Sequence, residues 1–176
     1  MKNNTGFTLV ETLVAISILS LSILATFTAV QKGLQSSEIA KDQVTTFYLT
    51  QEVMEYIKNI RDQNVLASLG GASVNWLAGL SGAASDPCYF GKTCQIDSPA
   101  KTATECVGGA NNCLYLKQDS STGLVGYASG TNTVFKRSVQ FQSVSADEVK
   151  VTVTMAWTAR GTAQSFSVTE SLFNRK

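Results

Sequence analysis

The chain has 176 residues, 44% of them hydrophobic, and a net charge of +1 from 14 basic and 13 acidic side chains. This length suits one modest domain plus an extended element, and this hydrophobic content is typical of a folded chain. No histidine is present, which excludes imidazole catalysis and histidine-ligated metals. No surface rich in Lys or Arg and aromatic residues is indicated, so no nucleic-acid partner is predicted.

The first predicted element is an apolar helix at the N-terminus. Residues 7–30 carry one charge, Glu11, and the next charge is Lys32. As an α-helix this segment would be about 36 Å long, enough to cross a bilayer. A secretory signal peptide is the ordinary alternative, but its apolar region would be shorter, roughly 7–15 residues. A carboxylate at the membrane centre costs about 2.5–3.5 kcal/mol, so Glu11 requires an explanation.

The residues around Glu11 supply one. The segment Gly6-Phe7-Thr8-Leu9-Val10-Glu11 resembles the processing site of type IV pilins and of the pseudopilins of type II secretion. The resemblance implies that residues 1–6 are a leader cut off after Gly6. It further implies N-methylation of Phe7. Glu11 then becomes the fifth residue of the mature chain, and its carboxylate is expected to pair with the N-terminal amine of a neighbouring subunit.

The same resemblance implies partners and a location. Prepilin peptidase, other pilin or pseudopilin subunits and an inner-membrane assembly platform are expected partners, with membrane lipid before assembly and no cofactor. The chain is expected to cross the inner (cytoplasmic) membrane once, with its N-terminus inside, and then to join an extracellular or periplasmic filament. Lys2 on the short side agrees with this orientation. A plain membrane anchor is the alternative, which Glu11 and the many small and hydroxyl residues of the helix disfavour.

The helical pattern continues beyond the expected membrane segment, residues 7–32, into an exported domain, residues 33–176. Gly33 is interpreted as a flexible joint. An apolar stripe, expected to pack on a sheet, then runs to about Asp62. Its members are Val44, Phe47, Tyr48, Val53, Met54, Ile57 and Ile60. The segment 47–61 resembles the corresponding helix of bacterial minor pilins.

A glycine-rich insert, about residues 66–133, is expected to be mostly loop. It contains Cys88, Cys94, Cys106 and Cys113. A zinc site is one interpretation, but no CxxC pair is present, so two disulfides in an oxidising compartment are favoured. Three connectivities are possible, and we favour pairing between neighbours. Three aromatic residues of the insert are expected to anchor it to the core, with exposed contact residues as the alternative: Trp76, Tyr89 and Phe90.

The C-terminal part, about residues 134–173, changes to a period of two. Residues 149–157 alternate apolar and polar side chains, and shorter alternations precede and follow them. An antiparallel meander of three strands is predicted, with one or two more strands from 114–116 and 124–127. The predicted fold is therefore α+β, a long N-terminal helix packed on a sheet, which is also the pilin fold.

These observations predict a structural protein rather than an enzyme. The preferred function is a subunit of a type IV pilus, of the minor kind. The alternatives are a minor pseudopilin of a type II secretion system and a pilus-tip module for binding or DNA uptake. The cysteines and the long insert favour the pilus.

Overall fold

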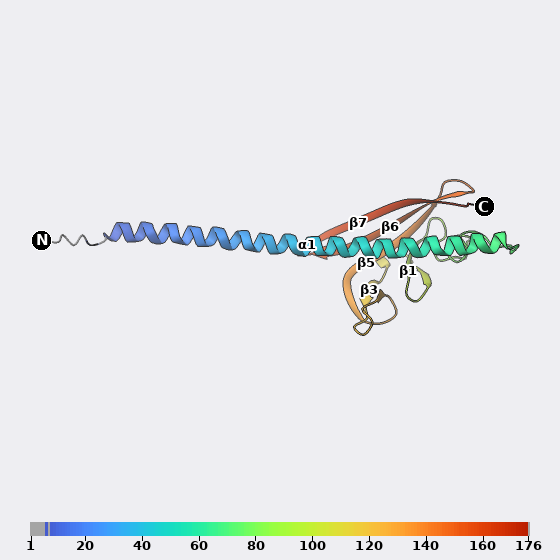
Figure 1. The fold of residues 1–176 in the computed structure, drawn as a ribbon, viewed down its shortest axis with the longest axis horizontal. Helices are drawn as coiled ribbons and strands as arrows, with labels where there is room; N and C mark the ends of the chain where they lie inside the picture. Colours follow the sequence, from blue (N-terminus) through green and yellow to red (C-terminus); the bar gives the residue numbers. More distant parts are fainter. Residues whose placement is uncertain (1–5, 7, 176) are drawn as a thin grey trace. The chain divides into compact units, whose positions relative to one another are not determined.

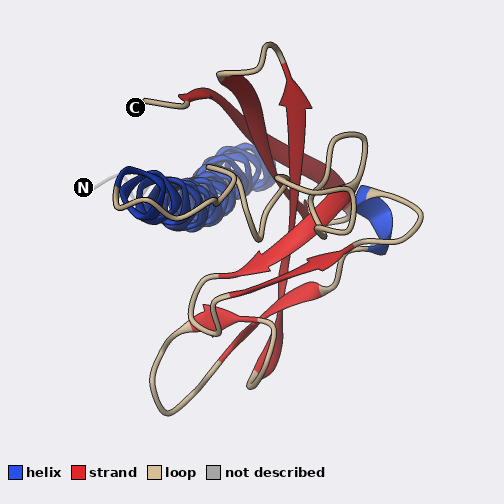
Figure 2. Ribbon diagram, turned by 90° about the vertical axis from the view of Figure 1, so that its right-hand side faces the viewer, coloured by secondary structure: helices blue, strands red, loops and turns tan. Residues whose placement is uncertain are grey.

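The structure, a computed structural model, describes residues 6 and 8–175 and confirms the predicted α+β class (Figures 1 and 2). The chain forms two compact units, unit 1 (Met1–Asp42) and unit 2 (Gln43–Lys176). Helix α1 (Leu9–Leu69) contributes to both. The other elements all belong to unit 2: β1 (Thr93–Asp97), β2 (Thr102–Glu105), the 3-10 helix η1 (Ala110–Asn112), β3 (Tyr115–Gln118), β4 (Val125–Gly126), β5 (Thr131–Ser143), β6 (Glu148–Ala159) and β7 (Thr162–Phe173).

Helix α1 is continuous through Gly33 and continues beyond Asp62, where the sequence predicts its end. It stops at Leu69 because two glycines follow. The Gly71 amide donates to the Ser68 carbonyl at 3.1 Å, and the Ala72 amide donates to the Ala67 carbonyl at 3.0 Å. This pair of bonds is a Schellman motif, which requires a left-handed residue. Gly71 provides it with φ of 94°.

Seven strands form one antiparallel sheet in which β5 is the central strand. One edge of β5 pairs with β6, and β6 pairs in turn with β7. The other edge of β5 is shared, since β3 pairs with residues 131–136 and β1 with residues 139–140. Two short hairpins, β1–β2 and β3–β4, therefore branch from the same edge of one long strand.

The predicted meander is confirmed as β5, β6 and β7, and the two additional predicted strands are β3 and β4. The β6–β7 connection is the tight turn of Arg160 and Gly161, with φ of 50° and 79°. Positive φ at both positions is typical of a two-residue hairpin turn that matches strand twist. This turn fixes a register in which Val153 lies opposite Val168.

Strands β1 and β2 lie where the sequence predicts loop. All five residues of β1 are buried, including Thr93, Gln95 and Asp97. Its five residues do alternate, with Cys94 and Ile96 between Thr93, Gln95 and Asp97, but the run is short and lies within the glycine-rich insert. The sequence analysis missed this strand signal.

One face of α1 packs on the sheet in unit 2, where β6 and β7 run alongside the helix (Figure 1). The buried helix residues are Thr46, Leu49, Thr50, Val53, Met54 and Ile57. Three members of the predicted stripe are exposed instead: Val44 at 55%, Phe47 at 51% and Tyr48 at 64%. Thr46 and Thr50 are buried instead. Their hydroxyls donate to the Gln43 and Thr46 carbonyls, so that the methyl group of each threonine packs on the sheet as a valine methyl would.

A fully buried Arg137 connects the helix to the sheet. Its guanidinium donates from Nη1 to the Leu49 carbonyl at 2.9 Å and from Nη2 to the Ile96 carbonyl at 2.6 Å. The ring of Tyr127 lies 6.0 Å from the guanidinium carbon, and burial raises the pKa of this tyrosine. Arg137 thus joins α1, β1 and β5 through backbone carbonyls.

Candidate processing and assembly segment

The segment expected to be processed lies immediately before α1. Gly6 is described and exposed, whereas Phe7, the expected site of cleavage and methylation, lies outside the described residues, as does the leader apart from Gly6. Glu11 lies in the first turn of α1 and is exposed.

Thr8 caps the helix. Its Oγ1 accepts a hydrogen bond from the Glu11 amide at 3.3 Å, and its carbonyl accepts one from the Thr12 amide at 3.2 Å. A threonine followed three residues later by a glutamate is the sequence of a capping box, and a carboxylate in the first turn also interacts favourably with the helix dipole. Sequence reasoning missed Thr8, although the Thr-x-x-Glu pattern was available to identify it.

Its place in the first turn gives the Glu11 carboxylate a role within its own chain, through the helix dipole. It stabilises the start of α1 by a contribution on the order of 0.3–1 kcal/mol. Glu11 lies in the first turn, near one end of the expected membrane segment, so its cost is below the roughly 2.5–3.5 kcal/mol of a carboxylate at the membrane centre.

The first part of α1 presents apolar side chains outward on all sides. Every described residue from 8 to 34 is exposed, from Leu9 at 76% to Val14 at 51% among the large apolar ones. By length and composition α1 is able to cross a membrane. Such a surface requires a cover of lipid or of other helices.

Five hydroxyl groups of this segment bond to carbonyls of the helix itself. Ser17 donates to the Leu13 carbonyl at 2.8 Å and Ser22 donates to the Ile18 carbonyl at 2.9 Å. Thr12, Thr26 and Thr28 form similar bonds three or four residues back. An apolar environment therefore does not leave these hydroxyls unpaired, and the small side chains allow close approach of a neighbouring helix.

The four cysteines form two disulfides in unit 2. Cys88 is joined to Cys94 and Cys106 to Cys113, which is the pairing between neighbours that the sequence analysis favours. Both pairs are buried, and no described cysteine is free, so a zinc tetrathiolate is excluded. The first disulfide attaches the loop that follows α1 to β1. The second closes the connection between β2 and β3.

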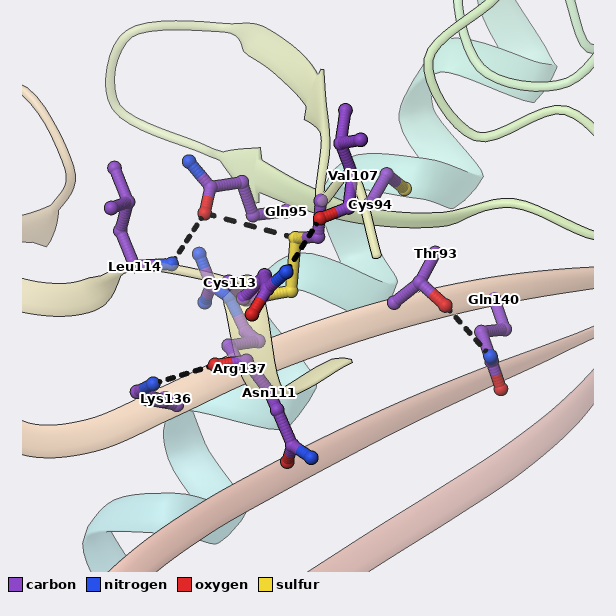
Figure 3. The surroundings of a disulfide bond; sticks show 12 residues. Thr93, Cys94, Gln95, Val107, Asn111, Cys113, Leu114, Lys136, Arg137 and Gln140 are labelled. Atoms are coloured by element: carbon purple, nitrogen blue, oxygen red, sulfur yellow. Dashed lines mark hydrogen bonds between the residues drawn. A yellow bond between two sulfur atoms is a disulfide. The ribbon is translucent and has the colours of Figure 1, made fainter. Parts of the chain in front are cut away.

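Figure 3 shows how the second disulfide is held. The Gln95 side-chain oxygen accepts a hydrogen bond from the Leu114 amide at 2.8 Å and lies 3.9 Å from the Cys106 sulfur. Lys136 Nζ donates to the Asn111 carbonyl at 2.8 Å. The disulfide loop is thus bonded to β1 on one side and to β5 on the other.

Two of the three aromatic residues of the insert anchor it as predicted. Trp76 and Phe90 pack against the main hydrophobic core, and Tyr89 contacts Phe90 with ring centroids 5.2 Å apart.

Across residues 6 and 8–175, no group of three or more His, Cys, Asp or Glu side chains is placed to hold a metal ion.

Comparisons with known proteins support the processing segment. Residues 1–27 match a family model described as the prokaryotic N-terminal methylation motif. No curated protein and no solved structure matches the chain. The chain therefore begins with a prokaryotic N-terminal methylation motif at residues 1–27, the signal carried by precursors of the type IV pilin kind.

Proposed function

We propose that this chain is a structural subunit, of the minor kind, of a type IV pilus. The methylation motif at residues 1–27 implies a substrate of prepilin peptidase that assembles with other pilins. The observation that carries the proposal is the continuity of this motif with an apolar helix whose described residues are exposed from 8 to 34. A surface of this kind is stable in lipid and also among similar helices, so transfer from membrane to filament leaves it covered.

In this proposal the peptidase cuts after Gly6, and the new N-terminal residue Phe7 is methylated. The chain first crosses the cytoplasmic membrane once with its N-terminus inside, and the helix from residue 7 to about 32 is the membrane part. Residues 33–176 are exported. Two disulfides in unit 2 agree with an oxidising compartment outside the cytoplasm.

Glu11 selects the position of the subunit in the filament. Its carboxylate pairs with the amine of Phe7 in a neighbouring subunit, because a buried charge is tolerated when paired and strongly disfavoured when unpaired. The Glu11 side chain is exposed in the isolated chain, which leaves its carboxylate accessible to a neighbour.

The test of this role is the substitution Glu11→Ala in cells that assemble filaments. We expect export and cleavage as in the wild type, with strongly reduced incorporation into sheared filaments, measured by mass spectrometry. Ser17→Ala is the matched control, since it removes another polar group of the same exposed segment whose hydroxyl bonds only to its own helix. Wild-type incorporation of Glu11→Ala would contradict the assembly role.

Processing is tested separately with Gly6→Leu. A bulky residue at the cleavage position should block the peptidase, so that no chain beginning at Phe7 is found by N-terminal mass spectrometry. Gly33→Leu makes the same change within α1, where an added Cβ meets no atom within 4 Å, and should be processed normally. Detection of a Phe7 N-terminus in Gly6→Leu would refute the cleavage position.

A minor pseudopilin of a type II secretion system is the alternative, because its processing and helix packing are the same. The two disulfides and the long insert between α1 and β5 favour the pilus. Sheared surface filaments distinguish the two: a pilus subunit is found in them at low abundance with an N-terminal Phe7. Absence from surface pili together with loss of protein secretion on deletion would favour the pseudopilin.

A further inference from the structure

A cavity of about 190 Å³ lies in unit 2 between the loop that follows α1 and the β5–β6 connection. The loop contributes three aromatic residues, Trp76, Tyr89 and Phe90, and the β5–β6 connection contributes Ser145 and Ala146. We propose that this cavity binds one neutral pyranose ring of a carbohydrate. The proposal goes beyond the proposed function and does not require the chain to be in a filament.

The aromatic wall is the first argument. Trp76, Tyr89 and Phe90 all line the cavity and are partly exposed, and Trp76 and Phe90 also pack against the core. Aromatic faces carry negative partial charge and attract weakly positive C–H groups. One face of a pyranose ring presents several such C–H groups, whereas its edge presents hydroxyls. An aromatic wall beside hydrogen-bonding groups is complementary to this amphipathic shape.

The polar groups of the cavity are neutral. No described residue that lines it is charged; the polar ones are serine, asparagine and tyrosine. Anionic or cationic ligands would therefore enter without a counter-charge, which is unfavourable. Neutral hydroxyl and amide groups are the ligand groups that this lining pairs best.

A buried hydroxyl without a partner also lines the cavity. Ser81 is 1% exposed, and its Oγ has no hydrogen-bond partner among the residues that the structure describes. Buried polar groups in native structures are seldom unpaired, and each exception requires an explanation. Ser81 lines the cavity but its Oγ is covered, so a ligand hydroxyl would become its partner only after the serine side chain rotates toward the cavity.

The size of the cavity limits the ligand. Pockets for drug-sized molecules are roughly 300–1,000 Å³, so this one accommodates a single ring rather than an oligosaccharide. The remaining units of a longer glycan would extend into solvent over Ser143 and Ser145, which are both exposed. The site is therefore expected to recognise a terminal sugar.

The aromatic wall is held in place before any ligand arrives. The Asn64 side chain, on α1, donates to the Ala78 carbonyl at 3.0 Å and to the Trp76 carbonyl at 3.3 Å. The Asn75 side chain accepts a hydrogen bond from the Leu77 amide at 2.8 Å. The disulfide between Cys88 and Cys94 holds the other end of the loop. A preformed site lowers the entropy lost on binding.

The experiment uses the full mature chain in a detergent without a sugar headgroup, because glucoside or maltoside detergents would occupy the site. Saturation-transfer NMR is recorded with methyl glucoside, methyl galactoside, methyl mannoside and N-acetylglucosamine as neutral probes. N-acetylneuraminic acid serves as the charged probe. We expect at least one neutral probe to receive saturation, most strongly at its ring C–H protons, and the charged probe to receive none.

Two variants locate the binding. Ala146→Arg places a long charged side chain at an exposed position of the cavity wall and should weaken binding at least about tenfold. Ala84→Arg makes the same change at an exposed position of the same loop outside the lining, and should bind as the wild type does. Ser81→Ala should weaken binding without lowering the melting temperature, because it removes an unpaired buried hydroxyl.

The proposal is overturned if no neutral sugar receives saturation, or if Ala146→Arg binds as tightly as Ala84→Arg. It is also overturned if a capped Gly-Phe-Gly peptide binds at this cavity and the sugars do not, because the site then recognises a peptide. Filament incorporation of Ala146→Arg is measured in parallel. A variant that assembles normally but has lost sugar binding separates this site from the assembly role of Glu11.

Discussion

Two stretches of one helix carry apolar side chains in opposite surroundings. In residues 8–34 of α1 every described side chain is exposed, whereas in residues 46–57 six side chains are buried against the sheet. Both stretches satisfy their hydroxyls in the same way, as Ser17 and Thr50 show by bonding to carbonyls four residues back. The helix itself is thus similar in both. What differs is whether the chain supplies its own cover.

This difference separates folding from assembly. The second stretch belongs to the core of unit 2, so its side chains should determine the stability of that unit. The first stretch is left exposed by residues 6 and 8–175, so its side chains should affect insertion and assembly and leave the stability of unit 2 unchanged.

The largest effect is expected from shortening a core side chain. Ile57 is fully buried, and Ile57→Ala should lower the free energy of unfolding of unit 2 by about 2–5 kcal/mol, through lost burial and the cavity left behind. Ile18→Ala is the matched control, since Ile18 is 60% exposed. Urea unfolding of the full chain in detergent, followed by tryptophan fluorescence, measures both. Equal destabilisation by the two variants would contradict the comparison.

Arg137 tests how the helix is held to the sheet. Arg137→Ala removes two hydrogen bonds to backbone carbonyls and a large buried side chain, so a loss of about 3 kcal/mol is expected. Hydrogen exchange should show the loss in the part of α1 around Leu49 and in β1, which the guanidinium joins. Exchange in residues 9–34 should not change. An exchange increase confined to β5 would mean that Arg137 does not connect these elements.

Removing a disulfide should have a smaller effect. Each one closes a short loop, with separations of 6 and 7 residues, so the chain-entropy model assigns about 2 kcal/mol to each. Replacing Cys106 and Cys113 by serine should lower the melting temperature of unit 2 and leave filament incorporation intact. Replacing Cys88 and Cys94 should in addition weaken sugar binding, because that pair holds the aromatic loop. A mass map of a non-reduced digest checks the pairing first.

Much of the fold could be predicted because burial on one face leaves a period in the sequence. Strands β5–β7 and the core residues Val53, Met54 and Ile57 were found in this way. The positions of Thr46 and Thr50 were not, because a threonine buries its methyl group only once its hydroxyl has bonded to the helix. Arg137 gives no sign of burial either, since its partners are carbonyls from residues far apart in the sequence.

The methylation motif could be predicted from Gly6, Phe7 and Glu11, because an enzyme that recognises such a motif binds a short, contiguous sequence. The cap at Thr8 was also local, and the Thr-x-x-Glu pattern identifies it. The cavity beside Trp76 could not be predicted, because it depends on how the loop and the β5–β6 connection meet. A contiguous motif can be identified from the sequence alone, whereas a cavity between distant segments can be identified only once the fold is known.

The smallest effect is expected at the exposed ion pair between α1 and β7. Lys58 Nζ lies 2.9 Å from a carboxylate oxygen of Glu170, which raises the pKa of the lysine. An interaction that raises the pKa of a lysine stabilises the fold fully below the ordinary lysine pKa of 10.5. This contribution is lost as the pH rises through the higher pKa of the folded state.

Because both side chains are partly exposed, the Lys58–Glu170 pair contributes only about 0.2–1 kcal/mol. Glu170→Gln should therefore destabilise unit 2 slightly at neutral pH, and the difference from the wild type should disappear as the pH rises through the folded pKa of Lys58. Glu55→Gln is the control, because Glu55 contacts Lys58 at 3.3 Å from within the helix and does not join α1 to the sheet. Equal destabilisation by the two variants would mean that the Lys58–Glu170 ion pair adds nothing to the attachment of α1 to β7. The hydrophobic core alone would then hold the helix on that strand.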